Sequence, residues 1–365
     1  MGSGVGVTRE PVVFQGIRSY VQGPGAVRAL GAHLAALGAD RRVCIVIDRT
    51  IPALLRPVRQ SLEDAGMQSR AFEFDGDLQA DTVARFAGNV RAEWDPGIVL
   101  GVGGGKTIDV SKIVAHELGA RTAVFATSSS TDAAPSHAAV LVDGDHQISA
   151  RSLDRNPDLV VVDSEIVASA PPRLFVAGIG DAISKKFEME TAASLGEPNA
   201  FRGRPAFFLP GMAASLHDCL LADGVEATRS VRAGAVTEAV ERVITACVLL
   251  SCLVWENGGL AGAHSIANVL FNGGHGARNL HGELVAFSLL VLLLLEGKRK
   301  DLEELVRFYR LLGLPGRASD LGIQPEGDEV SALCEAVHQR YKKHNLGYSA
   351  QEIRQAVEEL ERGAQ

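Results

Sequence analysis

The chain has 365 residues, of which 46% are hydrophobic and 22% charged, proportions typical of a folded globular protein rather than a disordered one. Its formal net charge is −8 and its lysines and arginines form no concentrated basic cluster, so we do not expect nucleic acid as a partner. The length exceeds that of one typical domain and predicts two, each with its own hydrophobic core.

The cysteines and the apolar runs bear on the compartment of the protein. The five cysteines are odd in number and include no C-x-x-C pair, so neither a disulfide framework nor a thiolate zinc site is predicted, and a reducing cytoplasm fits. The most apolar runs, 243–255 and 284–295, are shorter than the roughly 18 residues that a membrane span needs. We interpret them as buried helices and expect no membrane association.

The first half of the chain alternates between strand-like and helix-like segments. Strands are expected directly after Tyr20 and over 42–47, 70–74, 98–100, 122–126 and 159–163, and helices up to about Gly38 and over 52–66 and 82–94. This alternation predicts a Rossmann-like α/β domain over residues 1–165, with a parallel sheet covered by helices. After Pro171 and Pro172, helical periods dominate to about Glu361, so residues 166–365 are expected to form an all-α domain.

A glycine-rich stretch follows the expected strand 98–100. Residues 101–105 are expected to form a tight turn and Thr107 to begin a helix, which would leave backbone N–H groups free at the helix N-terminus. The stretch misses the P-loop pattern because Leu100 replaces a glycine, and it misses the dinucleotide fingerprint because Lys106 replaces another. A plain glycine-rich turn is the alternative. The three successive glycines before Lys106 nevertheless favour a cradle for a diphosphate.

Polar residues follow two other expected strands. Asp48 comes after a β-branched strand, where a carboxylate can accept hydrogen bonds from a ribose and repel a 2′-phosphate, which favours NAD over NADP. Capping of the next helix is the alternative for Asp48. Residues 127–132 can present hydroxyls to a cofactor and the carboxylate of Asp132 to a substrate, the alternative being a solvated Ser/Thr turn.

Three residues in the second half of the chain are candidate metal ligands. Asp181 follows two glycines at what we expect to be the start of a helix, His264 lies in a glycine-rich stretch, and His281 precedes the longest apolar helix. At the edge of a buried element an unpaired charge or imidazole is costly. Taken alone, each histidine is better explained as a structural residue. Together, two imidazoles and a carboxylate form a typical catalytic zinc set with a position open for a substrate oxygen.

As a set, the motifs resemble the glycerol dehydrogenase branch of the iron-containing (group III) alcohol dehydrogenase family. The segments that carry the resemblance follow the family's order and are 20–26, 101–109, 130–133, 156–163, 177–182, 258–264 and 281–283. The resemblance implies a dehydroquinate synthase-like architecture and an NAD-linked, metal-dependent polyol dehydrogenase, with its active site between the two halves. It also implies a homo-oligomer.

The family's functional residues can be carried over position by position. The resemblance assigns the metal ligands to Asp181, His264 and His281 and the substrate contact to Asp132. The cofactor-binding residues that we expect are Asp48, Gly103, Gly104, Gly105, Lys106, Asp109, Thr127, Ser130 and Ser136. The proton would leave through water or a histidine such as His275. Lys185 stands where iron enzymes of the family place a further ligand, which favours Zn²⁺ over Fe²⁺.

Two departures from the family pattern concern the wall of the substrate pocket. Ala267 stands where glycerol dehydrogenases have a second histidine, and Val142 where they have a tyrosine near the nicotinamide. These losses of bulk predict a polyol that is larger than glycerol or differently shaped, such as a cyclitol or an amino-polyol.

Three other functions remain open. The first is a glycerol-1-phosphate dehydrogenase-like enzyme, which shares the ligand set. The second is a carbocycle lyase similar to 3-dehydroquinate synthase or 2-deoxy-scyllo-inosose synthase, although a glutamate would then be expected at the position of Asp181. The third is a nucleotide-binding protein without catalysis.

Overall fold

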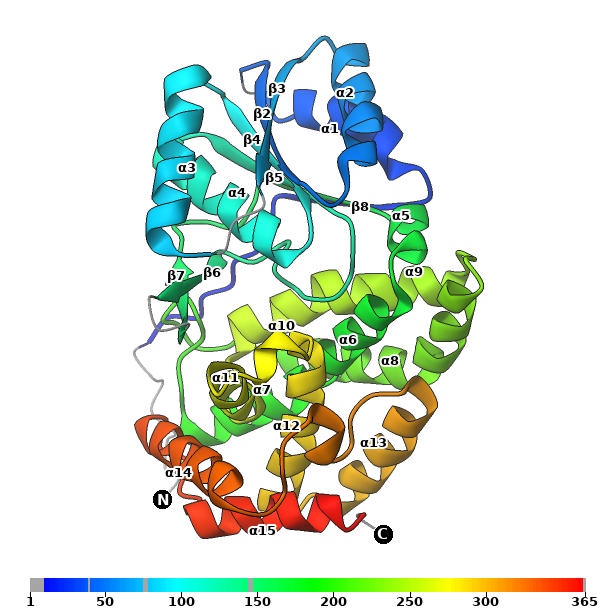
Figure 1. Cartoon of the computed structure of the whole chain (residues 1–365). Coiled ribbons are helices and arrows are strands. Elements are labelled where there is room, and N and C mark those ends of the chain that lie inside the picture. The colour runs from blue at the N-terminus through cyan, green and yellow to red at the C-terminus, as the bar shows by residue number, and fades with distance from the viewer. Residues whose placement is uncertain (1–9, 39, 75–77, 144–146, 364–365) are drawn as a thin grey trace, which may run out of the picture.

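The computed structural model describes residues 10–38, 40–74, 78–143 and 147–363. A six-stranded sheet flanked by helices occupies one end of the molecule, and the helices of the second half of the chain fill the other (Figure 1). The predicted combination of an α/β half and a helical half is therefore confirmed. The division into two domains near residue 165 stays a prediction.

All six strands of the large sheet run parallel, in the order β1-β8-β5-β4-β2-β3. They are β1 (Ser19–Gly23), β2 (Arg42–Asp48), β3 (Gln68–Phe74), β4 (Ile98–Gly103), β5 (Arg121–Ala126) and β8 (Leu159–Asp163). A second, antiparallel pair, β6 (Ala138–Asp143) and β7 (Gln147–Ser152), was not predicted, because β7 carries little of the β-branched pattern that marks a buried strand.

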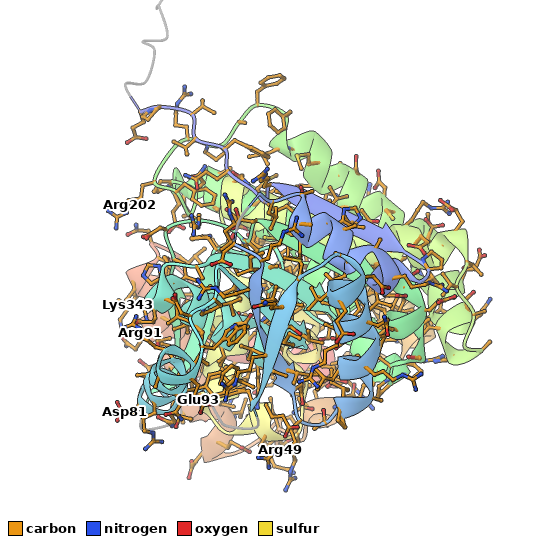
Figure 2. The ribbon with its side chains drawn as sticks, turned by 90° about the horizontal axis from the view of Figure 1, so that it is seen from above. Arg49, Asp81, Arg91, Glu93, Arg202 and Lys343 are labelled. Atoms are coloured by element: carbon orange, nitrogen blue, oxygen red, sulfur yellow. The ribbon has the colours of Figure 1, made fainter. Side chains whose placement is uncertain are left out.

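Helices cover both faces of the sheet. On one face lie η1 (Ala26–Ala29), α1 (Leu30–Ala35), η2 (Pro52–Leu54) and α2 (Leu55–Asp64), and on the other α3 (Ala80–Glu93) and α4 (Gly105–Leu118). Successive side chains of β2 point to opposite faces of the sheet. Val43 and Ile45 pack toward α1 and α2, whereas Cys44 and Val46 pack toward α3 and α4. The outer side of α3 carries exposed charges of both signs, including Asp81 (Figure 2).

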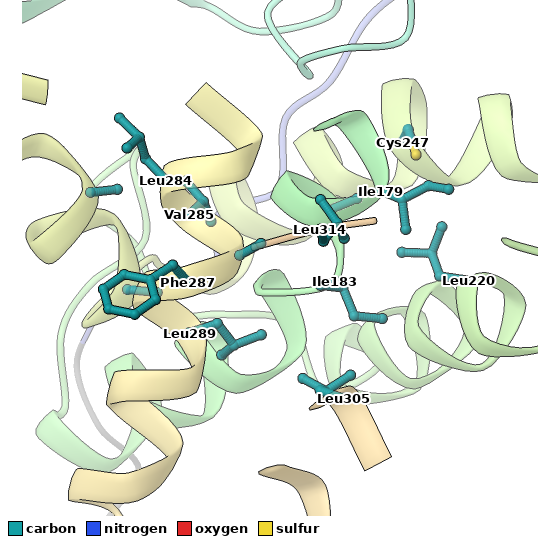
Figure 3. Packing of buried hydrophobic residues seen from close by; sticks show 14 of the residues in the cluster. Ile179, Ile183, Leu220, Cys247, Leu284, Val285, Phe287, Leu289, Leu305 and Leu314 are labelled. Atoms are coloured by element: carbon teal, nitrogen blue, oxygen red, sulfur yellow. The ribbon is translucent and has the colours of Figure 1, made fainter. Parts of the chain in front are cut away.

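The second half of the chain is helical. Its elements are α5 (Ser164–Ser169), α6 (Pro172–Ala182), α7 (Lys185–Leu195), α8 (Leu209–Arg232), α9 (Glu238–Thr245), the π-helix η3 (Ala246–Leu250), α10 (Ser251–Gly258), α11 (Ala263–Asn272), η4 (His275–Ala277), α12 (His281–Leu295), α13 (Arg299–Leu312), η5 (Ser319–Leu321), α14 (Asp328–Lys343) and α15 (Ala350–Glu361). Helix α12 is apolar around its whole circumference, which suits a helix buried on all sides by α6, α11, α13 and α15. Ile179 and Ile183 share a core with Leu220 of α8 and with Leu284 and Phe287 of α12 (Figure 3).

The helical core also receives side chains from the sheet. Val124 of β5 and Val160 of β8 belong to the same hydrophobic cluster as α6 and α12, while their neighbours Phe125 and Val161 face the opposite layer. The carboxyl ends of β5 and β8 are thereby held beside the helices that carry the candidate ligands. Within the described ranges no single helix is both long and apolar enough to cross a membrane, although the bent pair Glu238–Gly258 and Ala263–Asn272 meets those criteria jointly.

Candidate metal and cofactor site

The three predicted metal ligands converge from three helices. Asp181 lies in the last turn of α6, His264 in the first turn of α11, and His281 begins α12. Asp181 Oδ1 is 3.2 Å from His264 Nε2 and 3.9 Å from His281 Nε2, and the three potential ligand atoms all lie within 4.8 Å of one another. Two imidazoles and a buried carboxylate at such separations suit one small divalent ion.

Our expectation that Asp181 begins a helix was wrong, and the glycines before it explain the error. The helix begins at Pro172, since proline suits a first turn, and Gly178 and Gly180 lie inside it. A Cβ added at Gly178 would lie 1.8 Å from the carbonyl oxygen of Ser129, and one at Gly282 would lie 1.8 Å from that of Ala177. These glycines therefore bring α6 close to α12 and to the polar loop after β5.

Glu188 of α7 orients His264. Its Oε1 accepts a hydrogen bond from the backbone N–H of His264 at 2.8 Å, and its Oε2 lies 2.6 Å from His264 Nδ1. A carboxylate at Nδ1 keeps the proton on that nitrogen and leaves the lone pair of Nε2 for a metal. The residues present therefore fit a divalent metal, with the ring of His264 already turned so that Nε2 faces Asp181.

Burial and neighbouring charges shift the titration of the three ligands in opposite directions. Burial lowers the pKa of His281 to about 4, which keeps this imidazole neutral and able to bind a metal. Burial also acts to lower the pKa of His264, but Glu188 and Asp181 outweigh it and raise that pKa to about 9, so at neutral pH a metal that binds Nε2 replaces a proton there. Burial acts to raise the pKa of Asp181, yet Lys185 and the two histidines hold it well below its usual range.

Asp132 approaches the three ligands from the α/β half of the chain. Its Oδ2 accepts a hydrogen bond from Ser251 Oγ at 2.6 Å and lies 3.3 Å from Lys185 Nζ. Lys185 Nζ in turn donates to Asp181 Oδ1 at 2.7 Å and lies 3.1 Å from His264 Nε2. The residue predicted to contact substrate thus shares a lysine with two predicted metal ligands.

The glycine stretch divides into glycines that the packing requires and glycines that it does not. A Cβ at Gly101, which lies inside β4, would meet Ser111 Oγ at 2.1 Å, and one at Gly103 would meet Thr107 Cβ at 2.9 Å. At Gly104 and Gly105 the nearest atoms would be 3.9 and 3.4 Å away, so the protein itself leaves room there. Helix α4 begins at Gly105, two residues earlier than predicted, and no side chain caps its N-terminus. Open N–H groups beside that room fit a pyrophosphate.

Asp48 lies next to this cradle at the point where the sheet's connections diverge. Strand β2 leads to α2 on one face and the adjacent β4 leads to α4 on the other, and dinucleotides bind at such switch points. A Cβ at Gly103 would lie 3.2 Å from Asp48 Cβ, which places the carboxylate beside the glycines. Asp48 Oδ1 accepts hydrogen bonds from the N–H and the hydroxyl of Thr50.

Two predicted cofactor residues have their polar atoms engaged by the protein. Asp109 is buried, with Oδ1 2.8 Å from Lys112 Nζ and Oδ2 accepting from the N–H of Val140. Ser136 is also buried, and its Oγ accepts from the N–H of Ala138. These contacts hold the segment after β5 against α4, so a direct bond from Asp109 or Ser136 to a cofactor stays a prediction.

The other predicted cofactor residues lie near the cradle or on the polar loop. The N–H of Thr127 donates to the carbonyl of Gly103, which ties the loop to the glycines. Ser130 Oγ is 3.1 Å from Ser128 Oγ, and Lys106 is exposed in the first turn of α4. All three stay candidates for the cofactor.

The remaining predicted residues lie on neighbouring elements. His275 is in η4, with Nε2 3.4 Å from Glu329 Oε1 of α14. Ala267 is buried in α11, one turn after His264, and Val142 lies in β6 with its side chain against the α3 and α4 layer.

Three polar residues beside the candidate ligands are not among those predicted from the sequence. Glu188 lies outside every motif, Lys185 is predicted only as a position without a metal ligand, and Ser251 falls within an apolar run. A usable signal existed for the first two, because Asp181, Lys185 and Glu188 follow at intervals of four and three, which places them on one side of helical backbone. No comparable pattern in the sequence points to Ser251.

Comparison with known proteins gives the family. Residues 21–171 match the family model described as iron-containing alcohol dehydrogenase. A glycerol dehydrogenase of Thermotoga maritima is 36% identical over 312 residues and covers 85% of each chain, and a glycolaldehyde reductase of Halobacterium salinarum is 34% identical over 327 residues and covers 89% of each. The solved structure of a probable glycerol dehydrogenase from Sinorhizobium meliloti has a TM-score of 0.86 at 36% identity, covering 96% of this chain and 98% of its own. The chain therefore belongs to the glycerol dehydrogenase branch of the iron-containing alcohol dehydrogenase family.

Proposed function

We propose that this protein is an NAD-dependent, zinc-containing polyol dehydrogenase, which transfers a hydride between NAD and a polyol hydroxyl or the corresponding ketone. Membership of the family implies an oxidoreductase that uses NAD and a divalent metal. The choice of zinc rests on the donor set, since Asp181, His264 and His281 make three ligands and the position of a further one is held by Lys185.

One observation carries the proposal: Asp132, on the loop after β5, lies beside Lys185, which in turn contacts the candidate ligands Asp181 and His264. The same loop is tied to the glycine cradle through the bond from the Thr127 N–H to the Gly103 carbonyl. Residues 103–132 thereby link the cofactor cradle to the substrate carboxylate, and Lys185 links that carboxylate to two of the candidate ligands. A binding protein without catalysis has no need of this combination.

Each residue of the proposed site has a separate role in hydride transfer. A bound zinc ion supplies a Lewis acid that lowers the pKa of the substrate hydroxyl. Asp132 accepts a hydrogen bond from a neighbouring hydroxyl and so selects the carbon that reacts. Glu188 keeps the Nε2 lone pair of His264 available, and the cradle at Gly104 and Gly105 holds the pyrophosphate of NAD. His275 is the protein group that we propose, beside water, for taking the hydroxyl proton.

The substrate class is inferred from the size of the residue at position 267 and from the neutralised charge of Lys185. Ala267 lies one turn after His264 on α11, and a methyl group in place of an imidazole there favours a polyol bulkier than glycerol, such as a cyclitol or an amino-polyol. Lys185 is the cation beside the ligands, and Asp181 and Asp132 already neutralise it, which does not favour a phosphorylated substrate such as glycerol 1-phosphate. A homo-oligomer in the cytoplasm is part of the proposal.

The test is an NADH-linked assay over linear and cyclic polyols and their ketones, combined with metal analysis of the purified protein. The His281→Ala variant is expected to lose zinc and activity but still to bind NADH. The His275→Ala variant should keep its zinc, which separates a proton acceptor from a ligand. Full dehydrogenase activity and unchanged metal content in His281→Ala would refute the assignment.

A further inference from the structure

Lys185 is a buried cation at the centre of the predicted metal site. Its side chain is 1% exposed, and its Nζ lies 2.7 Å from Asp181 Oδ1, 3.1 Å from His264 Nε2 and 3.3 Å from Asp132 Oδ2. Two of these three neighbours are predicted metal ligands. The ammonium therefore makes contacts that a divalent ion would also make.

The positions of the two ligand atoms limit how far a metal could lie from this ammonium. Asp181 Oδ1 and His264 Nε2 are 3.2 Å apart. An ion at a normal zinc bond length of about 2.1 Å from both atoms would lie within about 4 Å of Nζ, wherever around the line joining them it were placed. A divalent ion and an ammonium that close together repel each other strongly in a buried site, where water screens little.

We propose that Lys185 is an internal cation that holds the metal site in its metal-free form and that weakens the binding of a divalent metal. The inference rests on the proposed function, because it takes Asp181 and His264 as ligands. In the absence of metal, the ammonium offsets the charge of the carboxylates of Asp181 and Asp132, which face it from both sides. Metal binding must displace it.

Asp132 is the acceptor to which the displaced ammonium moves. It is the third neighbour of Nζ and is not one of the ligands, and its side chain is 13% exposed. Ser251 Oγ binds the same carboxylate oxygen at 2.6 Å and fixes it in place. Occupation of the metal site would then tighten the pairing of Lys185 with Asp132, the residue proposed to contact substrate.

The experiment compares Zn²⁺ affinities of the full-length, metal-free protein by isothermal titration calorimetry. Lys185→Gln keeps hydrogen-bonding capacity but removes the charge, and we expect it to bind Zn²⁺ at least tenfold more tightly than wild type. Lys186→Gln is the matched control: it removes the same charge at the next residue, whose Nζ lies over the ring of Phe187 rather than among the ligands. Its affinity should equal that of wild type.

A second measurement covers the case in which Lys185→Gln folds poorly without metal. Melting temperatures are recorded with and without Zn²⁺, and the rise caused by Zn²⁺ should be larger in Lys185→Gln than in wild type or in Lys186→Gln. Asp132→Asn removes the second acceptor, so it should weaken Zn²⁺ binding, and this weakening should shrink in the double variant with Lys185→Gln.

The outcomes separate the inference from the function on which it rests. Equal or weaker Zn²⁺ binding by Lys185→Gln, with wild type binding normally, would overturn the inference and make Lys185 a support for the ligands. If neither wild type nor Lys185→Gln bound Zn²⁺, the metal assignment itself would fail. His264→Ala, measured in the same series, should abolish binding if the ligands are assigned correctly.

Discussion

Replacing Glu188 by glutamine tests how the site holds His264. The carboxylate accepts two hydrogen bonds, one from the backbone N–H of His264 and one from Nδ1. An amide offers one acceptor oxygen, so one of the two donors must face an NH₂ group. Loss of a charge-assisted bond of this kind costs about 1.5–3 kcal/mol. Because the lost bond orients the ligand His264, we expect the affinity for the metal to fall by about 10- to 100-fold.

The assay is a competition titration of Zn²⁺ against a chelator of known affinity, with circular dichroism to confirm that the variant is folded. Glu256 supplies the control, because its Oε1 likewise accepts from the backbone N–H of His137 and lies 2.5 Å from His137 Nδ1, outside the group of ligands. Glu256→Gln should destabilise the fold and leave Zn²⁺ affinity unchanged. Equal effects of the two substitutions on affinity, or an effect of Glu188→Gln below twofold, would show that Glu188 does not orient the ligand.

Three further predictions follow from the glycines, from the cofactor and from the metal. Gly282→Ala places a Cβ 1.8 Å from a backbone oxygen, so it should lower the free energy of unfolding by about 1–3 kcal/mol in urea titration. Gly88→Ala, on α3 with open space around it, should raise that free energy by up to about 1 kcal/mol. Changes of the same sign in both variants would contradict the packing argument. Gly105→Ala should leave stability within about 0.5 kcal/mol of wild type but weaken NADH binding about tenfold in a fluorescence titration, and undiminished NADH binding would remove the cradle from the cofactor site. Removal of zinc by a chelator should lower the melting temperature, since metal at 100 times its Kd stabilises by about 2.7 kcal/mol, and His264→Ala should melt at the same temperature with and without the chelator.

Much of the fold was predictable because local patterns decide it. β-Branched runs such as that in β2 have few alternatives to a buried parallel strand, and their regular alternation with helices fixes the class. The hairpin of β6 and β7 escaped prediction because β7 carries little of the β-branched pattern of a buried strand, and only β6 packs against α3 and α4. The place of Asp181 in its helix was misjudged because glycine usually ends helices, whereas here two glycines serve close packing.

The site was predictable to the level of residue types and no further. Aspartate and histidines in the family's order predicted the candidate ligands, since a metal demands those donors, and the fold brings these three residues together. What the ligands touch depends on how α6, α7 and α11 pack, and nothing in the spacing states that Glu188 faces Nδ1 of His264. The contact between Lys185 and Asp132 joins two halves of the chain, so it appears only once the fold is known.

The close approach at Gly282 makes the spacing between Asp181 on α6 and His281 on α12 a property of the backbone. Zinc bonds of about 2.0–2.2 Å and calcium bonds of about 2.3–2.6 Å differ by less than the shift that one methyl group would force at Gly282. A glycine that does not contact the ion would therefore help to determine which ionic radius the site accepts. A larger residue at Gly282 would move His281 away from Asp181 and so change which ion the same side chains fit.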